Sequence, residues 1–211
     1  MKRWGLHWPD RAAWLEWLRF LLIYYASFFP AYLLAPHFAL RDAVSPAFAW
    51  DANTPYLDMM ALPYLSVLPA FMLPLVLMRA ADIRKLGPAV ALCAVVAAVT
   101  FILVPTRASL TDAARQFGPL VSFIRLLDMP SNFVPSLHVA YGTLLALACA
   151  KAAPLRTQVV LFSWLALMSA STLLTHQHYM LDVVSGALLG VLAWWMTRSG
   201  GCAAAQAAQE P

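Results

Sequence analysis

Hydrophobic residues occur along this chain in long blocks that are separated by short polar stretches. The blocks cover residues 18–36, 57–78, 88–105, 134–150, 158–175 and 181–197. Each is close to the roughly 20 apolar residues that a helix needs to cross a bilayer core about 30 Å thick. Most of them lack the polar face that a helix of a soluble bundle shows at helical period. The pattern predicts an all-α, polytopic membrane helix bundle with about six transmembrane helices.

The composition agrees with a membrane protein. Of the 211 residues, 62% are hydrophobic and only 11% are charged, whereas a soluble domain carries about 25% charged residues. A soluble all-α fold is the alternative, but a fold of this size could not bury so much apolar surface. No linker or charge run divides the chain, so we expect one transmembrane domain over residues 1–198 and a disordered cytoplasmic tail over residues 199–211.

Basic residues are spread unevenly over the segments between the blocks. If the N-terminus is cytoplasmic, the cytoplasmic segments hold ten of the 14 lysines and arginines, and the outer loops hold four. The four outer ones are Arg41, Arg107, Arg115 and Arg125. By the positive-inside rule we therefore expect an N-in/C-in topology, with the first, third and fifth loops outside the cell membrane. The net charge of +4 forms no basic stripe, which argues against a nucleic-acid partner.

Local features refine the predicted helices. Residues 1–17 hold four tryptophans among charged residues, which is typical of an interfacial amphipathic segment; a simple aromatic belt is the other interpretation. In the last block, Gly186 and Gly190 have the spacing that lets two helices pack closely, and packing within the chain explains it better than dimerisation. Three prolines should kink the second helix, and they are Pro63, Pro69 and Pro74.

Two polar segments open the fourth and sixth blocks and contain the candidate chemistry. The first is Ser131–His138, at the end of a long third loop, and the second is His176–Asp182. The predicted topology puts both on the extracytoplasmic side. Ionisable groups at the ends of membrane spans are costly when they face lipid, so they usually face a bundle interior or a wet cavity. We therefore expect a functional site at this surface.

His178 and Asp182 stand four residues apart, which on a helix puts them on one face. A carboxylate there can accept the proton of one imidazole nitrogen and leave the lone pair of the other nitrogen free to attack. A second histidine, His138, could supply a proton to a leaving group. Two alternatives stay open: His138 and His178 are polar helix caps, or they form a metal cluster together with His176 and Asp182. The cluster is disfavoured because His176 and His178 would diverge by about 200° on a helix.

These residues resemble a known family. The segment Pro135-Ser136-Leu137-His138 is similar to the second motif of the phosphatidic acid phosphatase type 2 superfamily, and His178 followed by Asp182 is similar to its third. The phosphatases of that superfamily usually have Gly at the position of Leu137, and Ser-Arg where this chain has Ser171 and Thr172. Their first motif, a lysine ahead of an Arg-Pro pair, is missing. The chain most resembles the branch of inositol phosphorylceramide synthases and sphingomyelin synthases.

The missing cations have a physical meaning, because a phosphomonoester carries close to two negative charges near pH 7 and a phosphodiester only one. The resemblance therefore implies transfer of a phosphorylated head group from a membrane phospholipid to a lipid alcohol. Hydrolysis of a lipid phosphate, such as phosphatidate or a polyprenyl diphosphate, is the alternative. A non-catalytic, transporter-like bundle is a third hypothesis, although the two halves show no internal similarity.

The resemblance also implies roles for individual residues. His178 would be the nucleophile that becomes phosphohistidine, Asp182 would orient it, and His138 would act as acid and then as base. No metal or cofactor is implied. We expect substrate binding by Arg107, by Ser136 with the backbone amides that open the fourth helix, and by Asn132. Nothing in the sequence predicts the oligomeric state.

Overall fold

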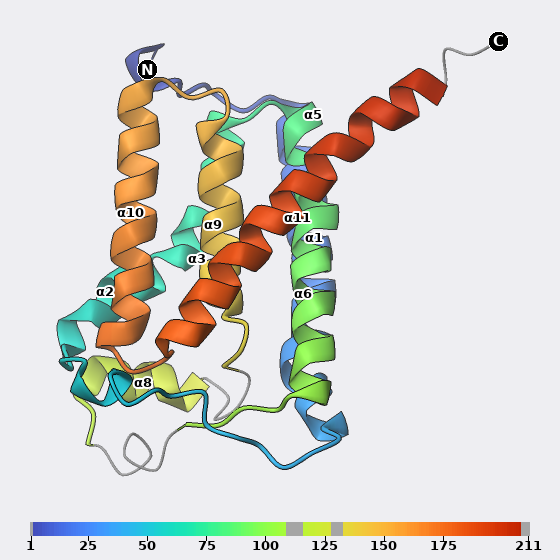
Figure 1. Ribbon diagram of the computed structural model, residues 1–211. Helices are drawn as coiled ribbons and strands as arrows, with labels where there is room; N and C mark the ends of the chain where they lie inside the picture. The colour runs from blue at the N-terminus through green and yellow to red at the C-terminus, as the bar shows by residue number, and fades with distance from the viewer. Residues whose placement is uncertain (1, 109–115, 128–132, 208–211) are drawn as a thin grey trace.

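The protein is a bundle of helices whose two termini lie at the same end (Figure 1). A computed structural model describes residues 2–108, 116–127 and 133–207. Within these ranges the regular elements are helical and no β-strand occurs, which confirms the predicted all-α class. The α-helices are α1 (Arg11–Phe29), α2 (Ala61–Leu65), α3 (Val67–Ala70), α4 (Leu73–Leu77), α5 (Ala80–Ile83), α6 (Leu86–Leu103), α8 (Pro119–Leu127), α9 (Leu137–Ala150), α10 (Leu155–Leu174) and α11 (Met180–Ala207).

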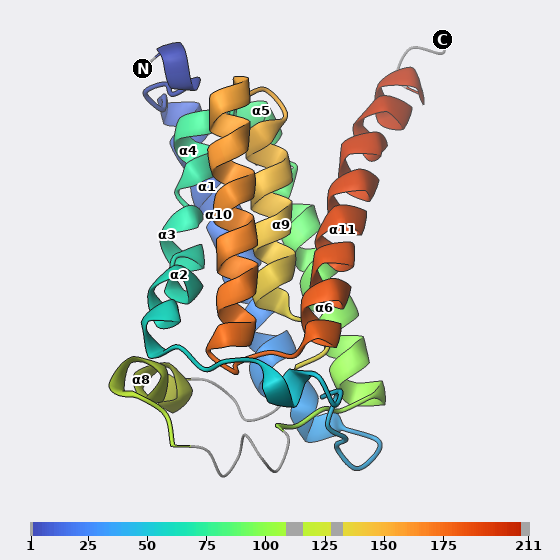
Figure 2. The same ribbon diagram turned by 60° about the vertical axis from the view of Figure 1, so that its left-hand side comes forward.

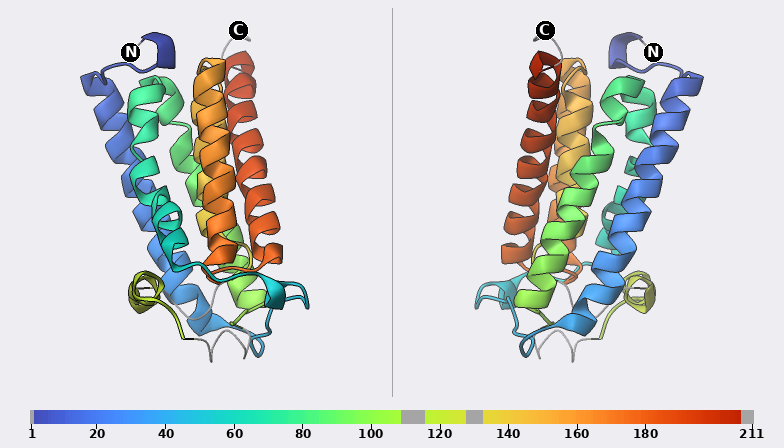
Figure 3. Two further views of the ribbon diagram at one scale, coloured as in Figure 1. Left: turned by 90° about the vertical axis from the view of Figure 1, so that its left-hand side faces the viewer. Right: turned by 90° about the vertical axis from the view of Figure 1, so that its right-hand side faces the viewer.

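The long helices run between two ends of the bundle. We call the end with both termini the terminal end, and the end with α8 and the α10–α11 connection the loop end (Figure 1). Helices α1, α6 and α10 lead toward the loop end, whereas α9 and α11 lead back (Figure 3). Helix α9 lies centrally and packs against α11, α10 and α6 (Figure 2). The segments that open α9 and α11 therefore meet at the loop end.

In the part of the chain that the structure describes, four helical segments are long and apolar enough to cross a membrane, which supports an integral membrane protein. They are Arg11–Phe38, Ala80–Leu103, Leu155–Leu174 and Met180–Thr197. They correspond to the first, third, fifth and sixth predicted blocks. The first begins at Arg11, seven residues before its predicted start at residue 18, because α1 already includes part of the segment expected to be interfacial. The fourth block forms α9, whose 14 residues span about 21 Å.

The second block differs from the single kinked helix that was predicted. It forms three short helices, α2, α3 and α4, because each of its prolines lacks the N–H that would continue the backbone ladder. The break between α2 and α3 is fastened to α10, since the indole Nε1 of Trp164 donates to the Ser66 hydroxyl at 2.8 Å. This segment leads from the loop end back to the terminal end as a broken path (Figure 2).

The two glycines of α11 lie where this helix crosses α9. A Cβ atom at Gly186 would come within 2.4 Å of the Ser136 carbonyl oxygen, and one at Gly190 within 2.5 Å of the Ala140 carbonyl oxygen. The expectation of close packing within the chain is confirmed. Helix α11 continues to Ala207, whereas a disordered tail was predicted from residue 199; the alanines of this stretch are strong helix formers.

The third loop contains a helix that the sequence reading missed. Helix α8 lies across the loop end (Figure 1) and buries Val121 and Ile124 in a small cluster with Ala61 and Tyr64 of α2. Its first turn is capped by the Asp58 carboxylate, which accepts from the backbone N–H of Val121 at 3.0 Å. Desolvation raises the pKa of Asp58, but this bond and those from Tyr56 and Leu120 outweigh it and hold the pKa below its ordinary value.

Candidate active site

A histidine and a carboxylate meet at the start of α11. His178 lies just before the helix and Asp182 lies in its first turn. Nδ1 of His178 is 3.3 Å from Oδ2 of Asp182, so the contact predicted from their spacing is present. The His178 side chain is 12% exposed and the Asp182 side chain is fully buried. Burial strengthens the interaction because the local dielectric constant is low.

Asp182 has further bonds that join the start of α11 to the start of α9. Its Oδ2 accepts from the backbone N–H of Tyr179 at 2.8 Å, and its own carbonyl oxygen accepts from the backbone N–H of Ser136 at 3.1 Å. Its Oδ1 is buried and has no hydrogen-bond partner among the described residues. Because a buried acceptor without a donor costs about 1–3 kcal/mol, Asp182 is more than an ordinary helix cap.

His176 lies in the turn that connects α10 to α11 and stabilises the backbone there. Its φ of +54° is left-handed, which is uncommon for a residue other than glycine. The N–H of His176 bonds to the carbonyl of Leu173, and the N–H of Gln177 to that of Thr172, which together form a Schellman ending of α10. The His176 Nε2 lies 3.1 Å from the carbonyl oxygen of Thr54.

The described part of the chain holds no group of three His, Cys, Asp or Glu side chains placed for a metal ion.

His138 lies in the first turn of α9 and is held by α2. Its ring stacks on the Tyr64 ring, with 4.1 Å between centroids and 16° between planes. Its Nε2 is 2.6 Å from the Tyr64 carbonyl oxygen, and since a carbonyl can only accept, Nε2 carries the hydrogen. The segment that leads into α9 reaches the other histidine, since the ring centroids of Phe133 and His178 are 6.1 Å apart. Nδ1 of His138 is then the nitrogen left for proton exchange.

Ser136 caps α9 and is fully buried. Its hydroxyl oxygen accepts from the backbone N–H of Val139 at 3.3 Å, so part of its hydrogen-bonding capacity is used for the cap. Within the described residues, the N–H groups of Leu137 and His138 have no acceptor. A helix N-terminus with free N–H groups favours an anion. The start of α9 thus offers donors beside His178 and Asp182.

Arg107 is fastened near the start of α9 through its backbone. Its N–H donates to the Val44 carbonyl at 3.0 Å, and its buried neighbour Thr106 accepts at Oγ1 from the backbone N–H of Phe133 at 2.9 Å. The Arg107 side chain is exposed and, within the described part of the chain, forms no ion pair. Asn132, also predicted to bind substrate, lies outside the described residues.

Asp51, which the sequence reading missed, belongs to the loop end as well. It is 7% exposed, and its Oδ1 accepts from the backbone N–H of Met180 at 3.1 Å. Its Oδ2 accepts from the backbone N–H of Phe48 at 2.8 Å. Asp51 thereby ties the segment between α1 and α2 to the first residue of α11. No local motif signals it, because 129 residues separate the two partners.

Comparison with known families decides what kind of protein this is. The sequence profile of the PAP2 superfamily matches residues 2–196, a range that includes both histidines and Asp182. The chain belongs to the PAP2 superfamily. Members of the PAP2 superfamily are phosphatases and phosphotransferases, so the protein is a membrane enzyme of this general kind, with lipid substrates. No curated protein and no solved structure matches the chain.

Proposed function

We propose that this PAP2 superfamily member transfers a phosphorylated head group from a phospholipid to a lipid alcohol through a phosphohistidine at His178. The observation that carries the proposal is the 3.3 Å contact between His178 Nδ1 and Asp182 Oδ2. If Nδ1 donates its hydrogen to the carboxylate, the lone pair of Nε2 is free to attack phosphorus. The resemblance to inositol phosphorylceramide and sphingomyelin synthases supports the same chemistry.

The reaction has two half-reactions. In the first, Nε2 of His178 forms a bond to phosphorus, the bond from phosphorus to the donor lipid's oxygen breaks, and His138 gives that oxygen a proton. In the second, the acceptor hydroxyl loses its proton to His138, its oxygen bonds to phosphorus, and the N–P bond breaks. Each acid or base step by His138 contributes about 10²- to 10⁴-fold in rate.

The Tyr64 carbonyl gives His138 a defined orientation in this scheme. Because Nε2 donates to that carbonyl at 2.6 Å, proton exchange with the substrate falls to Nδ1. A backbone acceptor of this kind fixes the tautomer of a histidine, as a carboxylate does. The orientation of the acid therefore depends on the broken segment α2–α4, and not on α9 alone.

The described residues around the site favour a substrate with one negative charge. Ser171 and Thr172, where the phosphatase pattern has Ser-Arg, are both fully buried in α10. Among the described lysines and arginines, none forms an ion pair with Asp182. The amides of Leu137 and His138 and the Arg107 side chain are the donors we assign to the phosphoryl oxygens. This set suits a phosphodiester better than a monoester.

The experiment is an assay of detergent-purified protein with a fluorescent phospholipid, with and without lipid alcohol acceptors, beside a His178→Ala control. We expect a new phosphorylated lipid that forms only with acceptor. A fluorescent lipid phosphate monoester is tested in parallel. Release of inorganic phosphate from it without acceptor would make the protein a phosphatase, the other activity of this superfamily. If neither product forms with the wild type, a non-catalytic bundle becomes the better hypothesis.

The phosphohistidine and the absence of a metal requirement are tested in the same preparation. Phosphohistidine is stable to alkali and labile to acid, so a labelled head group should stay on the wild-type protein through alkaline denaturation and be absent from His178→Ala. EDTA should leave the transfer rate unchanged. Loss of activity on chelation that zinc alone restores would support the metal alternative.

For topology, we propose six crossings with both termini in the cytoplasm and the site on the extracytoplasmic side. The support is the excess of basic residues at the terminal end and the shared location of the two termini (Figure 1). In a cysteine-free background, Ala108→Cys should react with an impermeant thiol reagent in intact cells, and Ala152→Cys should not. The reverse labelling pattern would invert the topology.

A further inference from the structure

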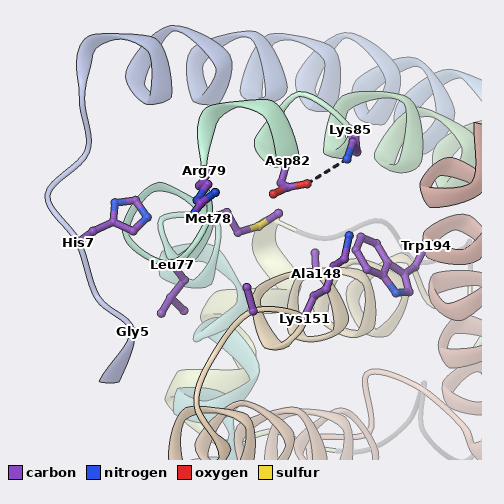
Figure 4. Close-up of a pocket in the computed structure, with 11 residues that line it drawn as sticks. Gly5, His7, Leu77, Met78, Arg79, Asp82, Lys85, Ala148, Lys151 and Trp194 are labelled. Carbon is purple, nitrogen blue, oxygen red and sulfur yellow. Dashed lines mark hydrogen bonds and ion pairs between the residues drawn. The ribbon is translucent and has the colours of Figure 1, made fainter. Parts of the chain in front are cut away.

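A cavity of about 460 Å³ opens at the terminal end of the bundle. Its walls come from the N-terminal segment, from the turn between α4 and α6, and from α9 and α11 (Figure 4). The histidines of the candidate active site lie at the opposite end. The cavity is therefore separate from the site of the proposed reaction.

Three cationic side chains line this cavity: Arg79, Lys85 and Lys151 (Figure 4). One carboxylate, Asp82, also lines it, and its Oδ1 is 3.0 Å from Nζ of Lys85. Within the described part of the chain, neither Arg79 nor Lys151 takes part in an ion pair. Three positive charges against one negative charge leave an excess of two, and the two unpaired cations are available to an anion.

The remaining lining is apolar. Leu77 and Met78 are both buried and lie beside the charged groups (Figure 4). Nζ of Lys151 lies 6.0 Å from the centre of the Trp194 ring, and tryptophan is typical of the membrane–water interface. The cationic side chains form what we call the rim of the cavity, and the buried Leu77 and Met78 form its apolar floor. This combination fits an amphiphile whose anionic group contacts the cations and whose first carbons contact the apolar side chains.

The N-terminal wall is fastened in place. The hydroxyl of Thr157 donates to the Trp4 carbonyl at 2.7 Å, and the backbone N–H of His7 donates to the Val76 carbonyl at 3.1 Å. The His7 ring lines the cavity (Figure 4), and its Nε2 is buried without a hydrogen-bond partner among the described residues. A rotation of the His7 ring would bring this nitrogen within reach of a phosphoryl oxygen, which would give it the partner that it lacks. The wall therefore adds a polar group to a preformed site.

We propose that this cavity binds the phosphoryl head group of an anionic phospholipid from the membrane leaflet at the terminal end. The excess positive charge selects an anion, the buried His7 nitrogen supplies a further polar contact, and the apolar floor selects a lipid over a soluble phosphate. Basic pockets between membrane helices bind anionic head groups in this way. The site is independent of the transfer reaction and has its own test.

The test is native mass spectrometry of the detergent-purified full chain with phosphatidylglycerol or phosphatidylcholine added. We expect the wild type to bind phosphatidylglycerol at least ten-fold more tightly than phosphatidylcholine. The double variant Arg79→Gln/Lys151→Gln should bind it about 30-fold more weakly, since each cation near an anionic head group contributes about five-fold. The control Arg84→Gln removes an exposed cation of the same turn outside the cavity, and it should change the affinity less than two-fold. Equal binding of both lipids, or an equal loss with Arg84→Gln, would overturn the proposal.

Two further arms keep the test decisive. Ala152→Glu puts a negative charge on the cavity lining and should weaken phosphatidylglycerol binding, whereas Ala81→Glu, exposed outside the cavity, should not. Inorganic phosphate at millimolar concentration should displace no lipid; displacement would overturn the assignment to a lipid. His178→Ala should bind phosphatidylglycerol like the wild type, which separates failure here from failure of the proposed reaction.

Discussion

The two ends of this bundle divide the properties that a phosphate-handling protein needs. At the loop end, His138 and His178 are half-buried and Asp182 is fully buried; the Tyr64 backbone carbonyl holds His138, and the Asp182 carboxylate holds His178. At the terminal end, three cations line an open cavity. A search for positive charge alone would find the terminal end. The groups that can make and break a bond to phosphorus lie at the other end, so charge and reactivity have to be judged separately.

The largest effect should come from the loop end. His178→Gln removes the nucleophile, and we expect the transfer rate to fall by about 10⁴-fold or more, because only binding and electrostatic stabilisation remain. The matched control is His176→Asn, since asparagine tolerates the left-handed backbone that His176 adopts. That variant should lose less than ten-fold. Equal losses in the two variants, measured as initial rates, would mean that the loop geometry and not the nucleophile was lost.

His138→Gln should have the second largest effect. Glutamine can still donate to the Tyr64 carbonyl but cannot carry a proton to the leaving oxygen, so we expect a loss of about 10²- to 10⁴-fold. The loss should shrink with a donor lipid that has a more acidic leaving alcohol, because such a group needs less protonation. A loss that is the same for both donors would argue for a role of His138 in packing.

Asp182→Asn should be less damaging. The amide oxygen can still accept from the Tyr179 N–H, but the negative charge beside His178 is lost. Loss of a carboxylate that orients a metal-binding histidine typically costs about 10- to 100-fold, and we expect a loss of this order or more here. The change should fall on kcat and not on KM. Asp51→Asn is the control, since Asp51 also caps the start of α11 but does not contact His178. If it reduces kcat as much, the effect of Asp182 would be structural.

The smallest effect concerns the contact between α9 and α11. Gly186→Ala brings a Cβ atom within 2.4 Å of the backbone oxygen of Ser136, which cannot move without shifting α9. Such overpacking costs about 1–3 kcal/mol, or roughly 2–12 °C in the apparent Tm of a chain this size. The close contact of Gly142→Ala is with the flexible tip of Met168, and Leu165 lies at an ordinary van der Waals distance, so this variant should leave Tm unchanged within about 2 °C. A thermal melt in detergent that shows equal shifts would contradict this account.

Local sequence patterns predicted the features that depend on neighbouring residues. The pairing of His178 with Asp182 follows from their spacing, and the close approach at Gly186 follows from the small side chain. The prolines of the second block were correctly identified as disruptive, but their effect was underestimated. Three prolines within 12 residues leave room only for helices of about one turn between them. Their spacing in the sequence was therefore enough to predict short helices in place of one kinked helix.

Contacts between distant parts of the chain could not be predicted in this way. Tyr64 and His138, which are hydrogen-bonded to each other, are 74 residues apart in the chain. Asp51 and Met180 are 129 residues apart. Each joins a side chain to a backbone group, and such bonds leave no complementary pair of side chains in the sequence. Helix α8 is a different case, because its apolar residues at Val121 and Ile124 have helical spacing and were overlooked within a loop assumed to be polar.

The bond from His138 to the Tyr64 carbonyl also has a genetic consequence. Its acceptor is part of the main chain, so every one of the 20 amino acids at position 64 retains it. A mutational scan would report on the Tyr64 ring, which stacks on His138, and would miss the carbonyl beneath it. Shifts in the register of α2, through single-residue insertions or deletions near Pro63, are the changes that would expose how much the enzyme depends on this oxygen.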